Sequence, residues 1–364
     1  MPVARVHRIS ADSPDDTAGL RQVIAAGQLD PAGITAIFGK TEGNGLVNDF
    51  SRGLAVRALT GLLEETLGYE RAAQVCLVMS GGTEGGMAPH WTVFERQEGA
   101  AGASPALAIG KAHTPALAPE QLGRRAQVEL VAEGVRAAMR DAAIDDPADV
   151  HFVQIKCPLL TAQRIAAADA RGATVATRDT LKSMGLSRAA SALGIGLALG
   201  EIDGSRITDA AIGSDWSLWS GRASTSAGIE LMGHEIVVLG VSAAWSGPLA
   251  IDHAVMADGL DIEPVRAALA RLGLDVPGQL PPSQRDRIVA VLAKAEASHD
   301  GRLRGHRHTM TDDSDISATR HARAFVAGSL GGLIGHAEIY VSGGAEHQGP
   351  DGGGPVAVIV SRAG

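Results

Sequence analysis

Aromatic side chains and cysteine are scarce in this chain of 364 residues. Phe, Trp and Tyr together make up 3% of the sequence, so few side chains are available for stacking nucleic-acid bases. The two cysteines, Cys76 and Cys157, each lie in an apolar segment. So few thiols argue against a disulfide framework and for a reducing cytoplasm.

Long apolar runs and basic clusters are also missing. No stretch reaches the roughly 18 consecutive apolar residues of a membrane span, and residues 1–8 lack the apolar core of a signal peptide. The formal net charge of −9 disfavours binding to nucleic acid and to anionic membranes. We therefore expect a cytoplasmic protein that binds neither nucleic acid nor a membrane.

Small and aliphatic residues are abundant instead. Apolar residues make up 45% of the chain, charged residues make up 20%, and there are 46 glycines. This composition is typical of a soluble globular protein in which helices pack closely on strands. The length alone predicts roughly two to three domains.

One serine motif occurs three times. The sequence reads SGGTE at residues 80–84, SAGIE at 226–230 and SGGAE at 342–346. The first and third copies follow apolar runs typical of buried strands, at residues 75–79 and 337–341. The small residues after each serine allow a backbone or a ligand to approach closely.

Two further features recur in the same order. In each third of the chain an apolar run ends in lysine, and a Ser/Thr-Arg pair that we expect to open a helix comes before the serine motif. The three sets are Lys40, Arg52 and Ser80; Lys156, Arg188 and Ser226; and Lys294, Arg320 and Ser342. We therefore divide the chain into three repeat units, residues 1–103, 106–249 and 253–364, with a linker of small residues at 99–105.

The repeat predicts an α/β fold. Three similar units can close around a pseudo-threefold axis with strands inside and helices outside, which places one active site on the axis. Three lysines, three arginines and three serines there would suit a small, flat, electron-rich ligand. A serine with a neutral lysine as base can attack a carbonyl carbon, and neighbouring cations and burial favour the neutral lysine.

These residues resemble the cyanuric acid hydrolase and barbiturase family of ring-opening cyclic amidases, over the whole chain. The motifs that carry the resemblance are FGK at 38–40, SR at 51–52, SGGTE at 80–84, SR at 187–188, STSAGIE at 224–230 and SGGAE at 342–346. The resemblance implies that Ser226 is the nucleophile and Lys156 its base. It also implies that the ring is held by Lys40, Arg52, Ser80, Gly81, Arg188, Ala227, Lys294, Arg320, Ser342 and Gly343.

The resemblance further implies a structural Mg²⁺ or Ca²⁺ ion, no cofactor for catalysis, and a homotetramer. The matching ligand positions are Glu296, Ala345, Gln348, Pro350 and Gly353, an all-oxygen set suited to a hard cation. Ala227 stands where the other two motifs have glycine, which narrows the space beside the nucleophile. The recurring Glu84, Glu230 and Glu346 receive no role from the sequence.

The expected reaction is opening of cyanuric acid to carboxybiuret, which loses CO₂ to give biuret. Three alternatives remain open at the level of sequence. The first is the same chemistry on barbituric acid, and the second is a non-catalytic binder of small cyclic anions in which the lysines stay charged. The third is a zinc amidohydrolase.

Overall fold

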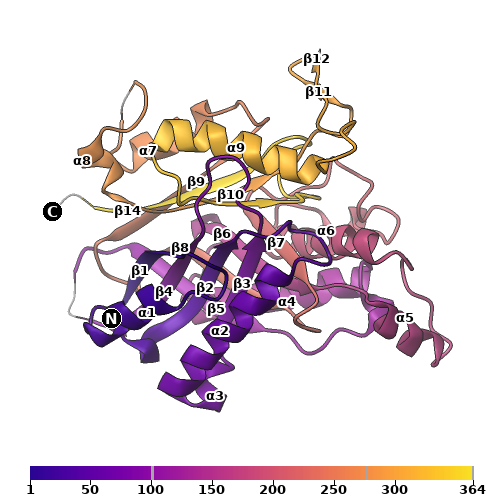
Figure 1. Ribbon diagram of the computed structural model, residues 1–364, viewed down its shortest axis with the longest axis horizontal. Coiled ribbons are helices and arrows are strands. Elements are labelled where there is room, and N and C mark those ends of the chain that lie inside the picture. The colour runs from indigo at the N-terminus through magenta and orange to yellow at the C-terminus, as the bar shows by residue number, and fades with distance from the viewer. Residues whose placement is uncertain (100–101, 276, 363–364) are drawn as a thin grey trace.

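Three four-stranded sheets form the framework of the protein, as seen in a computed structural model that describes residues 1–99, 102–275 and 277–362 (Figure 1). The strand orders are β1-β4-β2-β3, β5-β8-β6-β7 and β9-β14-β10-β13, the same pattern three times. The strands are β1 Pro2–Ser10, β2 Ile34–Thr41, β3 Cys76–Gly81, β4 His90–Glu98, β5 Ala106–His113, β6 Val150–Pro158, β7 Ala223–Gly228, β8 Glu235–Ser242, β9 Leu249–Met256, β10 Ile288–Ala295, β13 Tyr340–Gly343 and β14 Gly354–Ser361. The predicted α/β fold of three like units is confirmed.

Helices lie outside the sheets, as the sequence predicts; Figure 1 shows α7 and α9 covering the outer face of the third sheet. The helices are α1 Ala18–Ala25, α2 Phe50–Leu67, α3 Tyr69–Ala72, α4 Arg125–Asp141, α5 Ala162–Asp169, α6 Thr180–Ala198, α7 Glu263–Arg271, α8 Pro282–Arg285 and α9 Ala318–Ile334. A small hairpin of β11 Arg302–Leu303 and β12 His306–Arg307 extends from the third unit. Among the described residues, no helix is both long and apolar enough to cross a membrane.

The lysine strand and the serine strand of each unit are parallel neighbours. The register pairs Lys40 with Ser80, Lys156 with Ser226, and Lys294 with Ser342. Parallel strands end at the same edge of a sheet, so each lysine lies beside its serine. The repeated order seen in the sequence therefore corresponds to a repeated geometry.

Two of the expected helix starts are wrong. Asp49, not Ser51, caps α2 by accepting a hydrogen bond from the Ser51 amide at 3.0 Å. Helix α6 begins at Thr180 under an Asp179 cap, so Arg188 lies in the middle of the helix. Aspartate upstream of each helix is a strong N-cap, which is why both helices begin earlier than the Ser-Arg pairs.

One apolar core joins the three sheets. Phe38 of β2 packs on Phe94 of β4 with ring centroids 4.6 Å apart, and on Tyr340 of β13 at 5.9 Å. All three rings are fully buried. Because Tyr340 belongs to the third sheet and Phe38 to the first, this packing holds β13, which carries Ser342, against the first sheet, and the same core continues into the second sheet.

The unit boundaries remain a prediction. Strand β9 begins at Leu249, before the expected start of the third unit at residue 253. Residues 100 and 101 of the expected linker, like residues 276, 363 and 364, lie outside the described part of the chain.

Candidate active site

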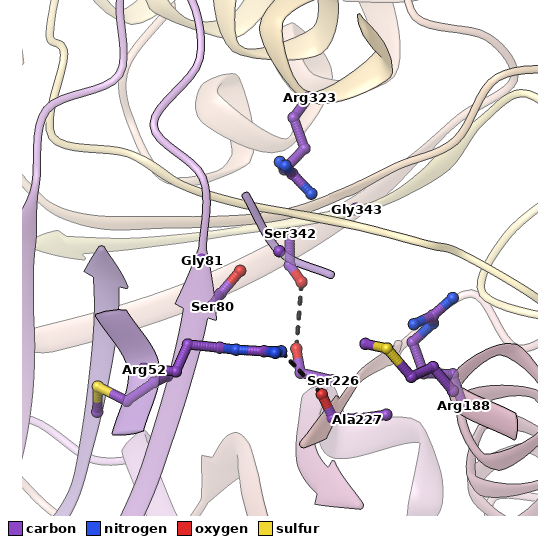
Figure 2. A pocket seen from close by; sticks show the side chains of 12 residues that line it. Arg52, Ser80, Gly81, Arg188, Ser226, Ala227, Arg323, Ser342 and Gly343 are labelled. Carbon is purple, nitrogen blue, oxygen red and sulfur yellow. Dashed lines mark hydrogen bonds between the residues drawn. The ribbon is translucent and has the colours of Figure 1, made fainter. Parts of the chain in front are cut away.

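Serine side chains from three sheets meet around one cavity (Figure 2). The Oγ atoms of Ser226 and Ser342 are 3.2 Å apart, and Ser80 lines the same space. The cavity encloses about 270 Å³, counting the part open to solvent. The residues expected to hold a ring that do line it are Arg52, Ser80, Gly81, Arg188, Ala227, Ser342 and Gly343, together with the expected nucleophile Ser226.

The third arginine at the cavity is Arg323, whereas the sequence predicted Arg320. Arg323 is one helical turn further along α9, is 2% exposed and lines the cavity. The Arg320 side chain is 36% exposed and donates from Nε to Glu84 at 2.9 Å. Residues three apart share a helix face, so the pattern could have suggested Arg323 as well. Gly45, Met79 and Met184 also line the cavity and were missed.

The three lysines are buried beneath the serines. Lys40 Nζ donates to Ser80 Oγ at 3.3 Å, and Lys294 Nζ donates to Ser342 Oγ at 3.2 Å. Lys156 instead donates to the Met79 carbonyl at 3.0 Å, and no hydrogen bond joins it to Ser226 in the described part of the chain. Lys156 and Ser226 are therefore paired in the strand register, but their side chains are not hydrogen-bonded to each other.

Each of two lysines also reaches into the preceding unit. Lys294 donates to the carbonyl of Thr225, the residue before Ser226, at 2.9 Å. The Lys156 bond to Met79, the residue before Ser80, is its counterpart. The lysines thus link the serine strands of neighbouring units.

Burial lowers the pKa of all three lysines. For Lys294 burial, followed by the nearby Arg188 cation, lowers the pKa to about 7. Burial also sets the Lys40 pKa well below its ordinary value, and Arg323 adds to the effect. Burial lowers the pKa of Lys156 too, but the Glu230 carboxylate opposes the change. Neutral lysine at near-neutral pH is what a general base requires.

The glutamates of two serine motifs hold cavity arginines. Arg323 donates from Nε and Nη2 to Glu84 at 2.8 and 2.6 Å. Arg188 donates from the same atoms to Glu346 at 2.8 and 2.5 Å. Each pair crosses between units and is bidentate, which fixes the guanidinium plane. Glu84 and Glu346 therefore aim the arginines at the cavity.

The glutamate of the Ser226 motif, Glu230, faces a lysine and not an arginine. The Glu230 Oε1 atom lies 3.5 Å from Lys156 Nζ, and its buried Oε2 atom has no hydrogen-bond partner among the described residues. Arg52 donates instead to the carbonyls of Ala227 at 3.0 Å and Leu46 at 2.5 Å. Its buried Nε atom lies 3.8 Å from Asp49 Oδ2 and makes no hydrogen bond within the part of the chain that the structure describes. We call each motif serine, with the lysine, arginine and glutamate beside it, a station. The Ser226 station is thus electrostatically unlike those of Ser80 and Ser342.

Tyr340 places a hydroxyl near the serines without a sequence signal for it. The side chain is fully buried, and its hydroxyl has no hydrogen bond of good geometry to any residue in 1–99, 102–275 or 277–362. Burial raises the Tyr340 pKa, and the hydroxyls of Ser226 and Ser80 partly offset that rise. A buried phenol facing two serines is available as a hydrogen-bond donor.

A second cavity of about 510 Å³, again counting the part open to solvent, reaches Lys156 from another side. Glu230 and Glu235 are among its lining residues. Burial raises the Glu235 pKa to about 7, although the carboxylate accepts a hydrogen bond from the Leu77 amide at 2.8 Å. The environment of Lys156 therefore contains two carboxylates.

Four of the five expected cation ligands lie on the loop between β13 and β14. The fifth, Glu296, directly follows β10 and reaches this loop, where its carboxylate accepts from the amide of Ala345 at 2.8 Å. Burial and the neighbouring Glu346 carboxylate raise the pKa of Glu296. Turn hydrogen bonds join Gln348 to Ala345 and Gly353 to Pro350, each at 2.9 Å. A carboxylate beside a turn with several carbonyls is a donor set that fits a hard divalent cation.

Gln348 connects this loop to the serine cavity. Its buried side chain accepts from the amide of Thr225, beside Ser226, at 2.6 Å. Its amide group donates to the carbonyls of Gly344 and Glu346 at 3.1 and 3.3 Å. The position of the β13–β14 loop thus influences the backbone at the central serine.

Known proteins match the whole chain. Residues 5–361 match the family described as amidohydrolase ring-opening protein. The cyanuric acid amidohydrolase of Azorhizobium caulinodans is 66% identical, over 100% of this chain and 99% of its own length. That of a Bradyrhizobium species is 61% identical, over 99% of this chain and 98% of its own length.

Solved structures agree with the sequence matches. The crystal structure of cyanuric acid hydrolase from A. caulinodans has a TM-score of 0.94 at 65% identity and covers 100% of both chains. A second cyanuric acid hydrolase structure, described as an evolutionary innovation by structural concatenation, has a TM-score of 0.94 at 48% identity. It covers 99% of this chain and 100% of that one. The family resemblance read from the sequence motifs is thereby confirmed, and this chain belongs to the amidohydrolase ring-opening family.

Proposed function

We propose that the protein opens the ring of cyanuric acid by hydrolysis, with Ser226 as nucleophile and Lys156 as general base. The observation that carries the proposal is the cavity itself, with three serines and the guanidinium groups of Arg52, Arg188 and Arg323 around it. Cyanuric acid presents three equivalent carbonyl groups in one plane, so each can meet one serine and one arginine. The names of the two relatives and two solved structures point to the same substrate.

The reaction follows from these side chains. Neutral Lys156 takes the proton of Ser226 as Oγ bonds to a ring carbonyl carbon, and arginine and serine donors stabilise the resulting oxyanion. The carbon–nitrogen bond then breaks, and the lysine proton passes to the departing ring nitrogen. Water attacks the acyl-enzyme with Lys156 again as base, which releases carboxybiuret and restores Ser226. Carboxybiuret loses CO₂ to give biuret.

The choice of Ser226 rests on the resemblance and on the asymmetry of its station. Lys40 and Lys294 are each hydrogen-bonded to the serine of their own unit, at 3.3 and 3.2 Å. Within the described residues Lys156 donates to the Met79 carbonyl, and the Ser226 Oγ atom contacts Ser342. For the proposed step the Lys156 amine moves from the Met79 carbonyl into hydrogen-bond reach of Ser226, because a general base must contact the proton that it takes.

Steady-state kinetics of the purified protein test the proposal. We expect hydrolysis of cyanuric acid with a higher kcat/KM than that of barbituric acid, and production of biuret. Faster turnover of barbituric acid would assign the protein the alternative substrate. Tight binding of cyanuric acid without ring opening would mean a non-catalytic binder with charged lysines.

We also propose a structural Mg²⁺ or Ca²⁺ ion held by the Glu296 carboxylate and by oxygens of Ala345, Gln348, Pro350 and Gly353. The ion would offset the repulsion between Glu296 and Glu346 and would order the loop that Gln348 ties to Thr225. Thermal unfolding with and without chelator tests this proposal. We expect chelation to lower Tm in the wild type but not in Glu296→Gln; equal Tm in the wild type would refute it.

The family resemblance is also the basis for the oligomeric state and the cellular location that we propose. We propose a homotetramer in the cytoplasm, which light scattering and cell fractionation would test. A monomer in solution or a secreted protein would overturn these two proposals without affecting the chemistry.

A further inference from the structure

Two histidines and one aspartate cluster outside the serine cavity, where the second and third sheets meet. His151 lies on β6, and Asp252 and His253 lie on β9. One potential ligand atom from each lies within 4.8 Å of the other two. Among residues 1–99, 102–275 and 277–362, this is the one group of at least three His, Cys, Asp or Glu side chains placed to share an ion. None of the three lines the serine cavity.

The spacing of the ligand atoms is close to that around a tetrahedral ion. The two histidine Nδ1 atoms are 2.9 Å apart, and His151 Nδ1 lies 3.6 Å from Asp252 Oδ1. Two nitrogens bound to one zinc ion at about 2.0–2.1 Å are roughly 3.3 Å apart. Opening the histidine pair by about 0.4 Å would therefore admit the ion.

The two imidazoles share one hydrogen bond between their Nδ1 atoms, so one Nδ1 carries a proton and the other presents a lone pair. Burial lowers the pKa of both rings, which agrees with this arrangement. When a metal ion binds, the Nδ1 proton moves to Nε2 of the same ring, and both Nδ1 lone pairs become available to the ion.

The surrounding charges orient the carboxylate and moderate the affinity. Arg271 donates from Nε to Asp252 Oδ2 at 2.5 Å, while Oδ1 accepts from the His253 backbone amide at 2.7 Å and lies 3.6 Å from His151 Nδ1. Such an outer contact fixes a ligating carboxylate. Arg222 and Arg271 lower the pKa of both histidines, whereas Asp252 raises it and Asp149 raises that of His151. The arginines repel a cation and the aspartates attract it. Because these effects oppose each other, the affinity for an ion depends mainly on the imidazoles.

A β-bulge aims His151 toward β9. The pairing of β6 with β8 shifts between Val150 and Phe152, so His151 is the extra residue. The other two units have bulges at the same place, with Thr35 and Val289 as the extra residues. Only the second unit therefore puts a metal-binding side chain at this position.

The strand that faces the bulge differs between units in the same way. By strand register, the positions of Asp252 and His253 correspond to Gly110 and Lys111 in β5 and to His7 and Arg8 in β1. The β6–β9 contact is thus the one place in the threefold arrangement where all three ligands coincide. The serine, lysine and arginine sets recur in every unit, but this cluster does not.

We propose that His151, Asp252 and His253 form a binding site for Zn²⁺ or a similar borderline ion such as Co²⁺. The side chains of His151 and Asp252 are 17% and 14% exposed, so solvent can supply the fourth ligand. The ion would join β6, the strand that carries Lys156, to the first strand of the third sheet. This inference does not depend on the proposed reaction.

Calorimetric titration with ZnCl₂ tests the site. The titration is done on chelator-treated protein in saturating Mg²⁺, so that the proposed Glu296 site is occupied by the hard cation. We expect one zinc equivalent in the wild type, with affinity reduced at least tenfold in His151→Gln and in His253→Gln. His306→Gln, an exposed histidine on the β11–β12 hairpin, serves as the matched control and should bind as the wild type does.

Cobalt absorption and thermal unfolding provide independent readouts. Co²⁺ should show the intense visible bands of a four-coordinate ion in the wild type and in His306→Gln but not in His151→Gln. Zinc should raise Tm of the wild type and leave that of His151→Gln unchanged. If His151→Gln does not fold, Asp252→Asn takes its place in the same titration. No zinc binding by the wild type, or equal binding by the cluster variants, would overturn the proposal.

Discussion

Two of the three stations around the cavity share one electrostatic design, and the third departs from it. At Ser80 and Ser342 the motif glutamate holds an arginine in a bidentate pair, and the lysine donates to its own serine. At Ser226 the glutamate faces the lysine, and Arg52 donates to backbone carbonyls. Threefold repetition thus produces three binding stations, whereas a local exception makes one of them chemically distinct.

The largest effect should come from the arginine that the structure places at the cavity. Arg323→Lys loses the planar fork that both meets Glu84 and faces the ligand, so we expect kcat/KM to fall about 100-fold. Arg320→Lys, three residues earlier and partly exposed, should change it less than about threefold. Steady-state kinetics of the two variants measure the contrast. Equal losses would mean that both arginines act as one unit through Glu84.

The motif glutamates should separate stability from catalysis. Glu346→Gln leaves the buried Arg188 cation without its anion and should cost about 2–4 kcal/mol in free energy of unfolding. Glu230→Gln removes a single 3.5 Å contact with Lys156 in place of a bidentate pair, so it should cost less, about 1 kcal/mol. Urea unfolding measures both.

Glu230→Gln should instead change the pH dependence of the reaction. Glu230 raises the pKa of Lys156, so its neutral replacement lowers that pKa further and extends activity to lower pH. The acidic limb of the plot of kcat against pH should therefore shift to lower pH in Glu230→Gln but not in Glu84→Gln. An unchanged limb in both variants would argue that Lys156 is not the base.

Tyr340→Phe tests the buried hydroxyl beside the serines. Removing an unsatisfied buried hydroxyl should leave Tm equal or slightly higher. Losing a donor that faces Ser226 should lower kcat about fivefold with little change in KM. Unchanged kcat would restrict Tyr340 to packing against Phe38.

The smallest effect concerns Glu235, whose pKa is raised to about 7 by burial. The folded state favours the protonated Glu235 carboxyl. Glu235 therefore makes its full contribution to the free energy of unfolding below its ordinary pKa of about 4.5, and this contribution is lost as the pH rises to about 7. Glu235→Gln stays neutral throughout and should raise Tm by about 3 °C at pH 8 and by almost nothing at pH 4.5. Scanning calorimetry at both pH values measures the difference; equal shifts would contradict the assignment.

Much of the architecture could be predicted from the sequence because it repeats. The Lys-to-Ser order in three units specifies parallel strand neighbours, and the register pairs each lysine with its serine. Small residues after each serine mark the strand ends that reach the cavity. Repetition thus supplied the support that one loose five-residue motif lacks.

The rest depended on contacts between units, which a linear pattern does not contain. Helix α6 begins two turns before Arg188 because Asp179 caps it. The three units therefore do not share an arginine at the start of a helix, although the sequence suggested one. The choice of Arg323 over Arg320 depends on where Glu84 of the first unit lies. The pairing of Glu230 with Lys156 depends on the three-dimensional position of both side chains, since the other two motif glutamates bind arginine.

A structure with a bound, slowly reacting cyanuric acid analogue tests most directly whether the exceptional station is the reacting one. The measured quantity is the distance from each serine Oγ to the nearest ring carbonyl carbon. We expect Ser226 Oγ to lie closest, at about 3–3.5 Å, with Lys156 Nζ within hydrogen-bond reach of it. A ring carbon placed closest to Ser80 or Ser342, with Ser226 only hydrogen-bonded to a ring oxygen, would contradict the account.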